Sequence, residues 1–199
     1  MHRPIRSAIL GCVLSASTLA AQSRAQIIAL KSFTPLNAAA GDDTLFARGL
    51  QAMVASELTT NRRVQVVDGA RAKSASFTVS ADVRSNADSV AIVTRISSAA
   101  GADVRVDTLA APANEAPSLA AAVAQIIGGA VTHSRSGGPV FRPPRPPIPR
   151  DAVTLYARAV VARSAGDADT AVRFFRQALR IAPRWTEPRR QLAMLNVAP

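Results

Sequence analysis

Apolar and polar residues alternate through the middle of the chain in a pattern that predicts a β-meander. Apolar residues recur at every second position over 77–83, at 90, 92 and 96, and at 104 and 106. Polar and turn-forming residues over 85–88 and around Gly101 separate the three runs. Because successive side chains of a strand point to opposite faces of a sheet, we expect three antiparallel strands with one buried and one mostly solvated face.

Two short apolar runs and two helical patterns flank this meander. Residues 27–30 and 64–67 are typical of buried strands. Between them, apolar residues fall at steps of four, three, one and four: Phe46, Leu50, Met53, Val54 and Leu58. These steps draw one stripe on a helix, which Asp42 or Asp43 can cap. An alanine-rich helix is expected over 117–131, with Leu119, Val123, Ile126 and Ile127 on its apolar face. The order predicts an α/β (α+β) mixed sheet with its two helices over one face.

The C-terminal part of the chain has only helical patterns. Ala152–Ala165 and Ala168–Ile181 predict two helices, which Gly166 ends and Asp167 begins. Thr186–Asn196 predicts a third, capping helix. A small all-α module, a helical hairpin plus a capping helix, is therefore expected to follow the α/β domain.

A proline-rich segment separates these two modules. Six prolines fall within 139–149. Proline fixes φ and lacks an N–H, so neither a helix nor a central strand is expected here. We interpret 135–150 as a semi-rigid Pro/Arg-rich linker. The alternative is a PxxP ligand for an aromatic groove, formed by Pro143, Pro144, Pro146 and Pro147 with Arg142 and Arg145 beside them.

The N-terminus has the pattern of an export signal. A basic start precedes a largely apolar stretch of thirteen residues over 8–20, and small residues suited to cleavage occur at its end and after it. A lipoprotein box ending at Cys12 is disfavoured, because most of the apolar run would follow the cysteine. The predicted organisation is a signal peptide over 1–25, an α/β domain over 26–134, the linker over 135–150 and the helical module over 151–199. No later stretch has the length of about 18 apolar residues that a membrane span requires.

Charge is concentrated at the C-terminal end. The whole chain carries +11, yet residues 26–134 hold nine basic and nine acidic side chains. Residues 135–199 hold twelve arginines and four acids, a net charge of +8. An acidic partner or an anionic envelope surface would therefore suit the helical module.

The α/β pattern resembles the TolB amino-terminal-like domain, which is related to envelope proteins of the FlgO and CsgG type. The resemblance covers about residues 26–132. It rests on IIALKSF, LFARGLQAMVASEL, RVQVVD, FTVSADVRSNADSVAIVTRISSAAGADVRVDTLA and SLAAAVAQIIGGAV. The family places a helix between its second and third strands, whereas Gly69–Ser74 is too short for one. The resemblance implies an interaction module of the bacterial envelope or of sensory proteins, without catalytic residues.

The helical module resembles one tetratricopeptide repeat. Small, aromatic and proline residues fall at the positions that the repeat requires: Ala159, Ala162, Ala171, Phe175, Ala178 and Pro183. Leu155 stands where the family has a tryptophan. About three such repeats are normally needed for stability. This module must therefore pack on its own α/β domain, on a second copy in a homo-oligomer, or on a partner.

The sequence lacks the residue groupings of common active sites. Beyond the predicted signal peptide there is no cysteine, and His133 is the only histidine. No His, Cys or carboxylate grouping has metal-ligand spacing, and no glycine-rich phosphate loop or nucleophile motif occurs. We therefore expect no enzyme activity and no cofactor.

Two functional hypotheses follow from these patterns. The first is an exported, periplasmic or secreted, non-catalytic adaptor that binds proteins of the bacterial cell envelope. Its expected contact positions are Tyr156, Arg173, Arg176, Arg180 and Trp185, although Trp185 could be a packing residue and the arginines a solvated face. The second is a protein that binds anionic lipid, lipopolysaccharide or another polyanion through the arginine-rich tail. Nucleic acid is disfavoured, because basic and aromatic residues are not interleaved.

Overall fold

The structure is a computed structural model that describes residues 25–36, 41–67, 69–132 and 145–196. The predicted signal peptide lies outside these residues except for Ala25, and so does the proline-rich segment up to residue 144. His133 also lies outside them.

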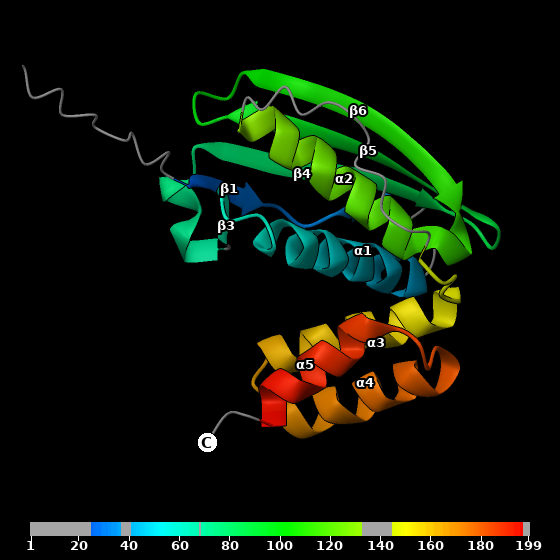
Figure 1. Cartoon of the computed structure of the whole chain (residues 1–199). Helices are drawn as coiled ribbons and strands as arrows, with labels where there is room; N and C mark the ends of the chain where they lie inside the picture. Colours follow the sequence, from blue (N-terminus) through cyan, green and yellow to red (C-terminus); the bar gives the residue numbers. More distant parts are fainter. Residues whose placement is uncertain (1–24, 37–40, 68, 133–144, 197–199) are drawn as a thin grey trace, which may run out of the picture.

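A mixed sheet forms one layer of the molecule (Figure 1). β1 (Gln26–Leu30) lies between β3 (Val64–Val67) and β4 (Phe77–Ser85) and is parallel to both. β4 pairs antiparallel with β5 (Ser89–Ser98), which pairs antiparallel with β6 (Asp103–Pro112). The strand order is β3-β1-β4-β5-β6, which confirms the predicted mixed sheet and its meander.

Two short elements were not predicted. β2 (Thr34–Pro35) pairs parallel with β4, and the N–H of Leu36 donates to the carbonyl of Val83 at 2.8 Å. The segment Gly69–Ser74, expected to be too short for a helix, forms the 3₁₀ helix η1. Neither element is long enough to show a periodic apolar pattern, and so neither is visible in the sequence.

The third strand of the meander, β6, does not bury the side chains that were expected to be buried. Val104 and Val106 are exposed on β6. Val106 pairs with Arg95, and Ile96, on the opposite face, pairs with Arg105. Directly paired residues share a face, so Val106 points away from the core side of the sheet. An irregularity at Ile96 adjusts the register between β5 and β6.

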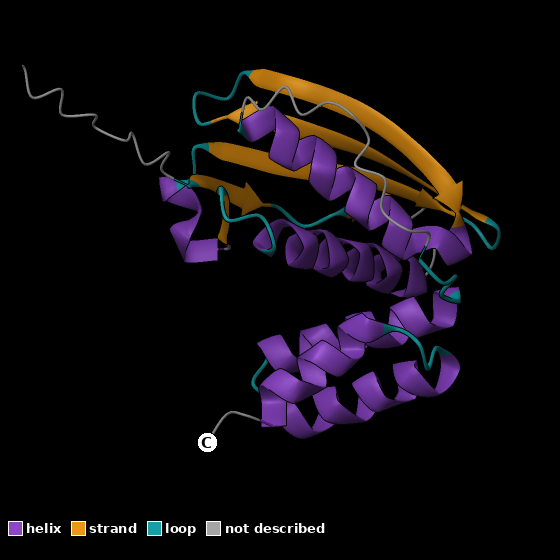
Figure 2. Cartoon of the chain, viewed as in Figure 1, coloured by secondary structure: helices purple, strands orange, loops and turns teal. Residues whose placement is uncertain are grey.

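Two helices cover one face of the sheet, as predicted (Figure 2). They are α1 (Gly41–Thr59) and α2 (Ala116–Val131), and the 3₁₀ turn η2 (Ala113–Glu115) precedes α2. The whole predicted stripe of α1 is buried. The prediction that Asp42 or Asp43 caps α1 is wrong, because the helix already begins at Gly41. Both carboxylates lie in its first turn, where the helix dipole favours them.

The remaining helices form a second helical layer, on the side of α1 that faces away from the sheet (Figure 1). They are α3 (Arg150–Ser164), α4 (Ala168–Ile181) and α5 (Thr186–Asn196). Gly166 has φ of +82°, and the Asp167 side chain accepts a hydrogen bond from the N–H of Thr170, so the predicted turn is confirmed. The small and aromatic positions facing between α3 and α4 are buried: Ala159, Ala171, Phe175 and Ala178. Kinship with the tetratricopeptide repeat stays a prediction.

Candidate functional site

The helical layer packs on the α/β domain through a close contact between α1 and α3. A Cβ atom on Gly49 of α1 would lie 3.4 Å from Cβ of Ala157 on α3 and closer still to Val153. Ala152, Val153 and Ala157 are fully buried in this contact layer. Of the three surfaces on which this module was expected to pack, the structure therefore shows its own α/β domain.

An ion pair fixes one end of this contact. Arg150, the first residue of α3, donates to Asp43 in the first turn of α1, and Ser85 Oγ donates to the same carboxylate oxygen at 3.1 Å. The Arg150 guanidinium also lies 4.4 Å from the ring centroid of Phe46. Its Nη1 reaches the carbonyl of Asn86 at 3.2 Å. Arg150 thereby connects the start of α3 to both α1 and the β4–β5 turn.

The described end of the proline-rich segment also packs on the α/β domain. Ile148 is 2% exposed, and its N–H donates to the carbonyl of Asn114 at 2.7 Å. Arg145 forms a 2.8 Å salt bridge with Glu57 of α1 and donates to the carbonyl of Pro117 of α2. Residues 145–149 are therefore held against α1 and α2 and do not extend as a free spacer.

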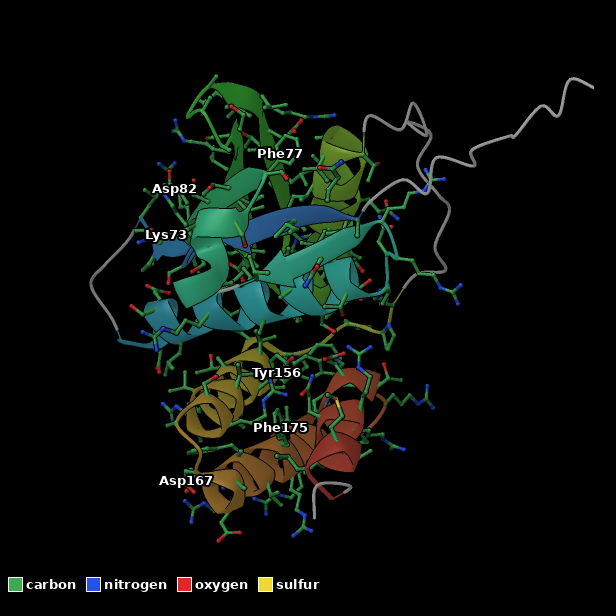
Figure 3. The ribbon with its side chains drawn as sticks, turned by 90° about the vertical axis from the view of Figure 1, so that its left-hand side faces the viewer. Lys73, Phe77, Asp82, Tyr156, Asp167 and Phe175 are labelled. Carbon is green, nitrogen blue, oxygen red and sulfur yellow. The ribbon has the colours of Figure 1, made fainter. Side chains whose placement is uncertain are left out.

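The interior of the helical layer is built around Tyr156. Its ring centroid lies 5.7 Å from that of Phe175 and 5.1 Å from that of Trp185, in tilted arrangements. Figure 3 shows Tyr156 and Phe175 between the helices. The Tyr156 hydroxyl donates to Glu187 Oε1 at 3.3 Å. Burial, reinforced by the negative charge of Glu187, raises the pKa of Tyr156 far above its usual value.

Glu187 gathers polar groups from both layers. Besides Tyr156, its carboxylate accepts hydrogen bonds from Ser56 of α1 at 3.1 Å and from Gln191 at 2.9 Å. Arg190 pairs with its second oxygen at 2.6 Å. Through these hydrogen bonds the Glu187 side chain connects its own helix, α5, to α1 and α3.

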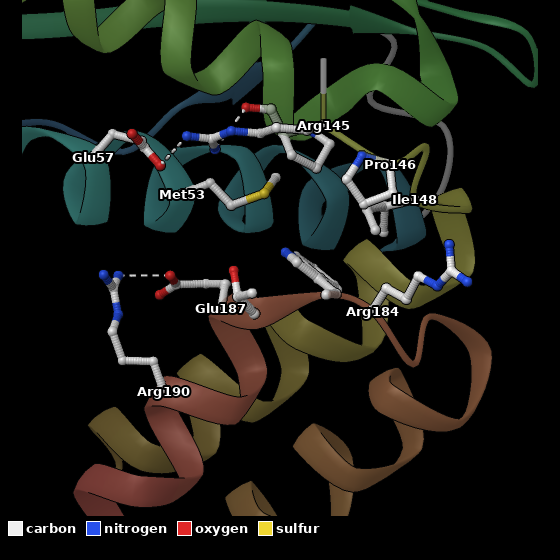
Figure 4. A pocket seen from close by; sticks show the side chains of 11 residues that line it. Met53, Glu57, Arg145, Pro146, Ile148, Arg184, Glu187 and Arg190 are labelled. Atoms are coloured by element: carbon white, nitrogen blue, oxygen red, sulfur yellow. Dashed lines mark hydrogen bonds and ion pairs between the residues drawn. The ribbon is translucent and has the colours of Figure 1, made fainter. Parts of the chain in front are cut away.

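A small pocket lies beside Glu187 (Figure 4). Its volume is about 230 Å³, and its apolar lining includes Met53, Ile148 and Trp185. The salt bridge of Arg145 with Glu57 and that of Arg190 with Glu187 lie at its edge (Figure 4). In each of these two pairs the positive charge of the arginine is balanced by the negative charge of the glutamate.

A larger cleft, called here the cationic cleft, lies between α1, the β1–β3 edge of the sheet, α3 and α5. Its volume is about 810 Å³. Much of its lining is aliphatic: Leu30, Ala52, Ala55, Val66, Val160 and Met194. Three arginines also line it, Arg48, Arg163 and Arg190, and none of the described residues that line it is acidic. The cleft therefore combines an apolar lining with positive charge.

The expected contact positions divide into two groups. Tyr156 and Trp185 are 1% and 5% exposed, so their rings contact the chain's own helices and are closed to a separate protein in this structure. Arg173, Arg176 and Arg180 lie on the exposed side of α4. The structure does not bring the two groups together into one surface.

The sequence did not point to the cationic cleft, because its lining comes from elements far apart in the chain. One signal was present. Ala52 and Ala55 form a second stripe of small residues on α1, beside the large apolar stripe, and it continues from Arg48 to Thr59. The close approach of α3 is at the neighbouring Gly49, and Ala52 and Ala55 line the cleft beside it.

Two features are absent from the described residues, a metal-binding cluster and a helix that could span a membrane. No three or more His, Cys, Asp or Glu side chains converge where they could hold a metal ion. Among the helices described, none is long and apolar enough to cross a bilayer.

No protein-family model and no curated protein matches the chain. Among solved structures, it is similar to a dodecamer of PelC from Paraburkholderia phytofirmans, with 16% identity and a TM-score of 0.42. This match covers 54% of this chain and 89% of that one. It is also similar to TolB from Acinetobacter baumannii, with 17% identity and a TM-score of 0.42, over 55% of this chain and 29% of that one.

Proposed function

We propose that the protein is an exported, non-catalytic adaptor that binds other proteins of the bacterial cell envelope. The observation that carries this proposal is the outer face of α4. The inner face of this helix packs on α3 through Ala171, Phe175 and Ala178, and its outer face keeps a row of arginines.

Arg173, Arg176 and Arg180 follow one another at steps of three and four residues, so they lie on one side of α4. All three are exposed, and none forms a salt bridge with an acidic side chain of the described residues. Arg173 donates to the Thr170 hydroxyl at 3.0 Å. A row of exposed guanidinium groups without such salt bridges suits an acidic protein surface, since such complementarity speeds association and selects the partner.

Features of the sequence support the location and the class of the proposed function. The basic and apolar pattern of residues 1–25 favours export. The resemblance of residues 26–132 to the TolB amino-terminal-like domain, and of 152–183 to a tetratricopeptide repeat, favours protein interaction. The packing of α3 on α1 would hold the arginine row in a fixed position relative to the sheet.

In-cell crosslinking with mass spectrometry tests the proposal. We compare the wild-type protein with a variant in which Arg173, Arg176 and Arg180 are changed to Glu. We expect discrete envelope proteins to be captured by the wild type and lost from this variant. The matched control reverses three exposed arginines of the α/β domain, Arg62, Arg63 and Arg84, and should keep the partners. The same partners with the α4 variant would refute the assignment to α4.

Binding to an anionic surface is the second candidate, and the same arginine row favours it. A net charge of +8 over residues 135–199 would attract lipid, lipopolysaccharide or another polyanion. Vesicles of phosphatidylglycerol should then bind the protein at low salt and release it at moderate salt. Strong vesicle binding without crosslinked protein partners would favour this candidate over the adaptor.

A further inference from the structure

We propose that the cationic cleft binds an amphiphilic anion, that is, a carboxylate or phosphate head group on an alkyl chain. This ligand site lies on the side of the molecule formed by α1, α3 and α5, and it is separate from the arginine row of α4 used above. The proposal rests on how charge and apolar surface are distributed in the cleft.

Positive charge in the cleft is only partly compensated. Arg190 pairs with Glu187, whose other oxygen accepts from Tyr156 and Ser56. Arg163 donates instead to the amide oxygen of Gln191, a neutral partner that orients the guanidinium without cancelling its charge.

Arg48 stands on the exposed side of α1. Neither Arg48 nor Arg163 forms a salt bridge with a carboxylate of the described residues. Guanidinium groups bind carboxylate and phosphate through paired N–H donors. An anionic head group is therefore the partner that would complete the charge balance of the cleft.

The aliphatic lining of the cleft suits the alkyl chain of such a ligand. Along α1 the lining runs from Arg48 through Ala52 and Ala55 to Thr59, eleven residues further on, which corresponds to about 16 Å of helix. The cleft volume of about 810 Å³ falls within the range of small-ligand sites. Met194, which is 58% exposed beside the cleft, has a flexible thioether side chain that can pack over an alkyl chain.

An alkyl chain fits these walls better than an extended peptide does. Three of the walls are the helices α1, α3 and α5, whose backbone groups are largely hydrogen-bonded within each helix. An extended peptide would leave many of its own N–H and C=O groups unpaired against them, and such groups are costly to bury. An alkyl chain has no such groups.

Displacement of a fluorescent probe tests the proposal. The purified protein is loaded with dansyl-labelled undecanoic acid, and unlabelled compounds compete with the probe. We expect dodecanoate or dodecyl phosphate to displace it, and the preference between them distinguishes a free fatty acid from a phosphate-bearing lipid as the source. Within either series, affinity should rise by up to about fourfold for each added methylene.

Two competitors serve as controls for the chemistry. Dodecyltrimethylammonium has the tail and the opposite charge, and butanoate has the head group and almost no tail. Neither should displace the probe. Equal displacement by the cationic detergent would overturn the proposal, as would displacement by an acidic peptide in preference to dodecanoate.

Variants locate the site. Arg48→Gln and Arg163→Gln should each weaken probe binding by about tenfold, the usual effect of losing a charged hydrogen bond. Ala55→Phe should also weaken it by filling the lining. Arg84→Gln removes the same charge from β4, outside the cleft, and should leave affinity unchanged.

Because Arg48 is exposed, its variant should fold even if Arg163→Gln does not. Unchanged affinity in both Arg48→Gln and Ala55→Phe would overturn the site. The adaptor proposal would be unaffected, since its test uses α4 and a different readout.

Discussion

A Cβ atom placed on Gly49 would lie 2.9 Å from Cγ1 of Val153 and 3.0 Å from the Val153 carbonyl oxygen. The two helices meet so closely that a methyl group cannot enter without a shift of the α3 backbone or of α1. This contact is where the helical module rests on the α/β domain. The absence of a side chain at Gly49 is thus a requirement of the interface between the modules.

Gly49→Ala should therefore destabilise the protein, although alanine is the better helix former. Overpacking typically costs about 1–3 kcal/mol, which outweighs a propensity gain of up to about 1 kcal/mol. Urea unfolding followed by the fluorescence of Trp185, the only tryptophan, measures the change. Gly129→Ala on α2 is the control, because its Cβ would meet nothing within 4 Å, and it should be neutral or stabilising. A gain in stability for both variants would contradict the close contact.

Arg150→Met should lower the free energy of unfolding by about 2–4 kcal/mol, because the largely buried carboxylate of Asp43 would lose its positively charged partner. The side chains of this pair are 22% and 17% exposed. In the Arg158–Asp42 pair they are 44% and 68% exposed, so Arg158→Met should cost only about 0–1 kcal/mol. A double-mutant cycle with Asp43→Asn measures the coupling directly. Equal effects of the two arginine variants would show that the Arg150–Asp43 pair contributes no more to the free energy of unfolding than the exposed pair does.

Tyr156 should not ionise until the protein unfolds. Its raised pKa means that the folded state favours the neutral phenol, because of burial first and the charge of Glu187 second. This contribution to stability is complete below the unfolded-state pKa of about 10 and is lost as pH rises above it, by about 1.4 kcal/mol for each pH unit.

The chain has one tyrosine, so the tyrosinate absorbance band reports on this residue alone. In guanidinium the band should appear with a midpoint near pH 10. In the native protein it should appear only together with the change in Trp185 fluorescence that marks unfolding. Tyr156→Phe should remove this part of the alkaline loss of stability. A native titration near pH 10 with unchanged fluorescence would show that the ring is accessible.

The sequence predicted those elements whose formation depends on local periodicity. The stripe from Phe46 to Leu58 defined α1, and the pairing of Gly166 with Asp167 defined the turn between α3 and α4. It misassigned Val104 and Val106, because only the register of β6 against β5 decides which face of a strand is buried.

The sites were less predictable than the elements, since they depend on which elements meet. Tyr156 and Trp185 were predicted to contact a partner, because nothing in their spacing showed that Trp185 would pack on Tyr156 or that Glu187 would bond both Tyr156 and Ser56. Arg163 and Arg48 are 115 positions apart in the sequence and line one cleft only because α3 packs on α1. The sequence around one arginine on a helix does not show which residues from distant elements will lie beside it.

Ile148 tests whether the proline-rich segment ends as a packed element. The sequence assigned 135–150 to a linker, whereas Ile148 is 2% exposed and its N–H is bonded to Asn114 of the α/β domain. Ile148→Ala should then cost about 2–4 kcal/mol, as for a core aliphatic residue. Ile181→Ala is the matched control: this side chain is 43% exposed, and its loss should change stability by about 0.5 kcal/mol or less.

Limited trypsin digestion gives a local readout of the same contact. Arg145 and Arg150 flank Ile148, and Arg145 is held by Glu57 and Pro117. The Arg145–Pro146 bond resists trypsin, so the site to follow is Arg150, which pairs with Asp43. In Ile148→Ala we expect faster cleavage after Arg150, because the segment would open more often. If this variant matches Ile181→Ala in both stability and cleavage rate, residues 145–149 behave in solution as the free spacer that their prolines predict.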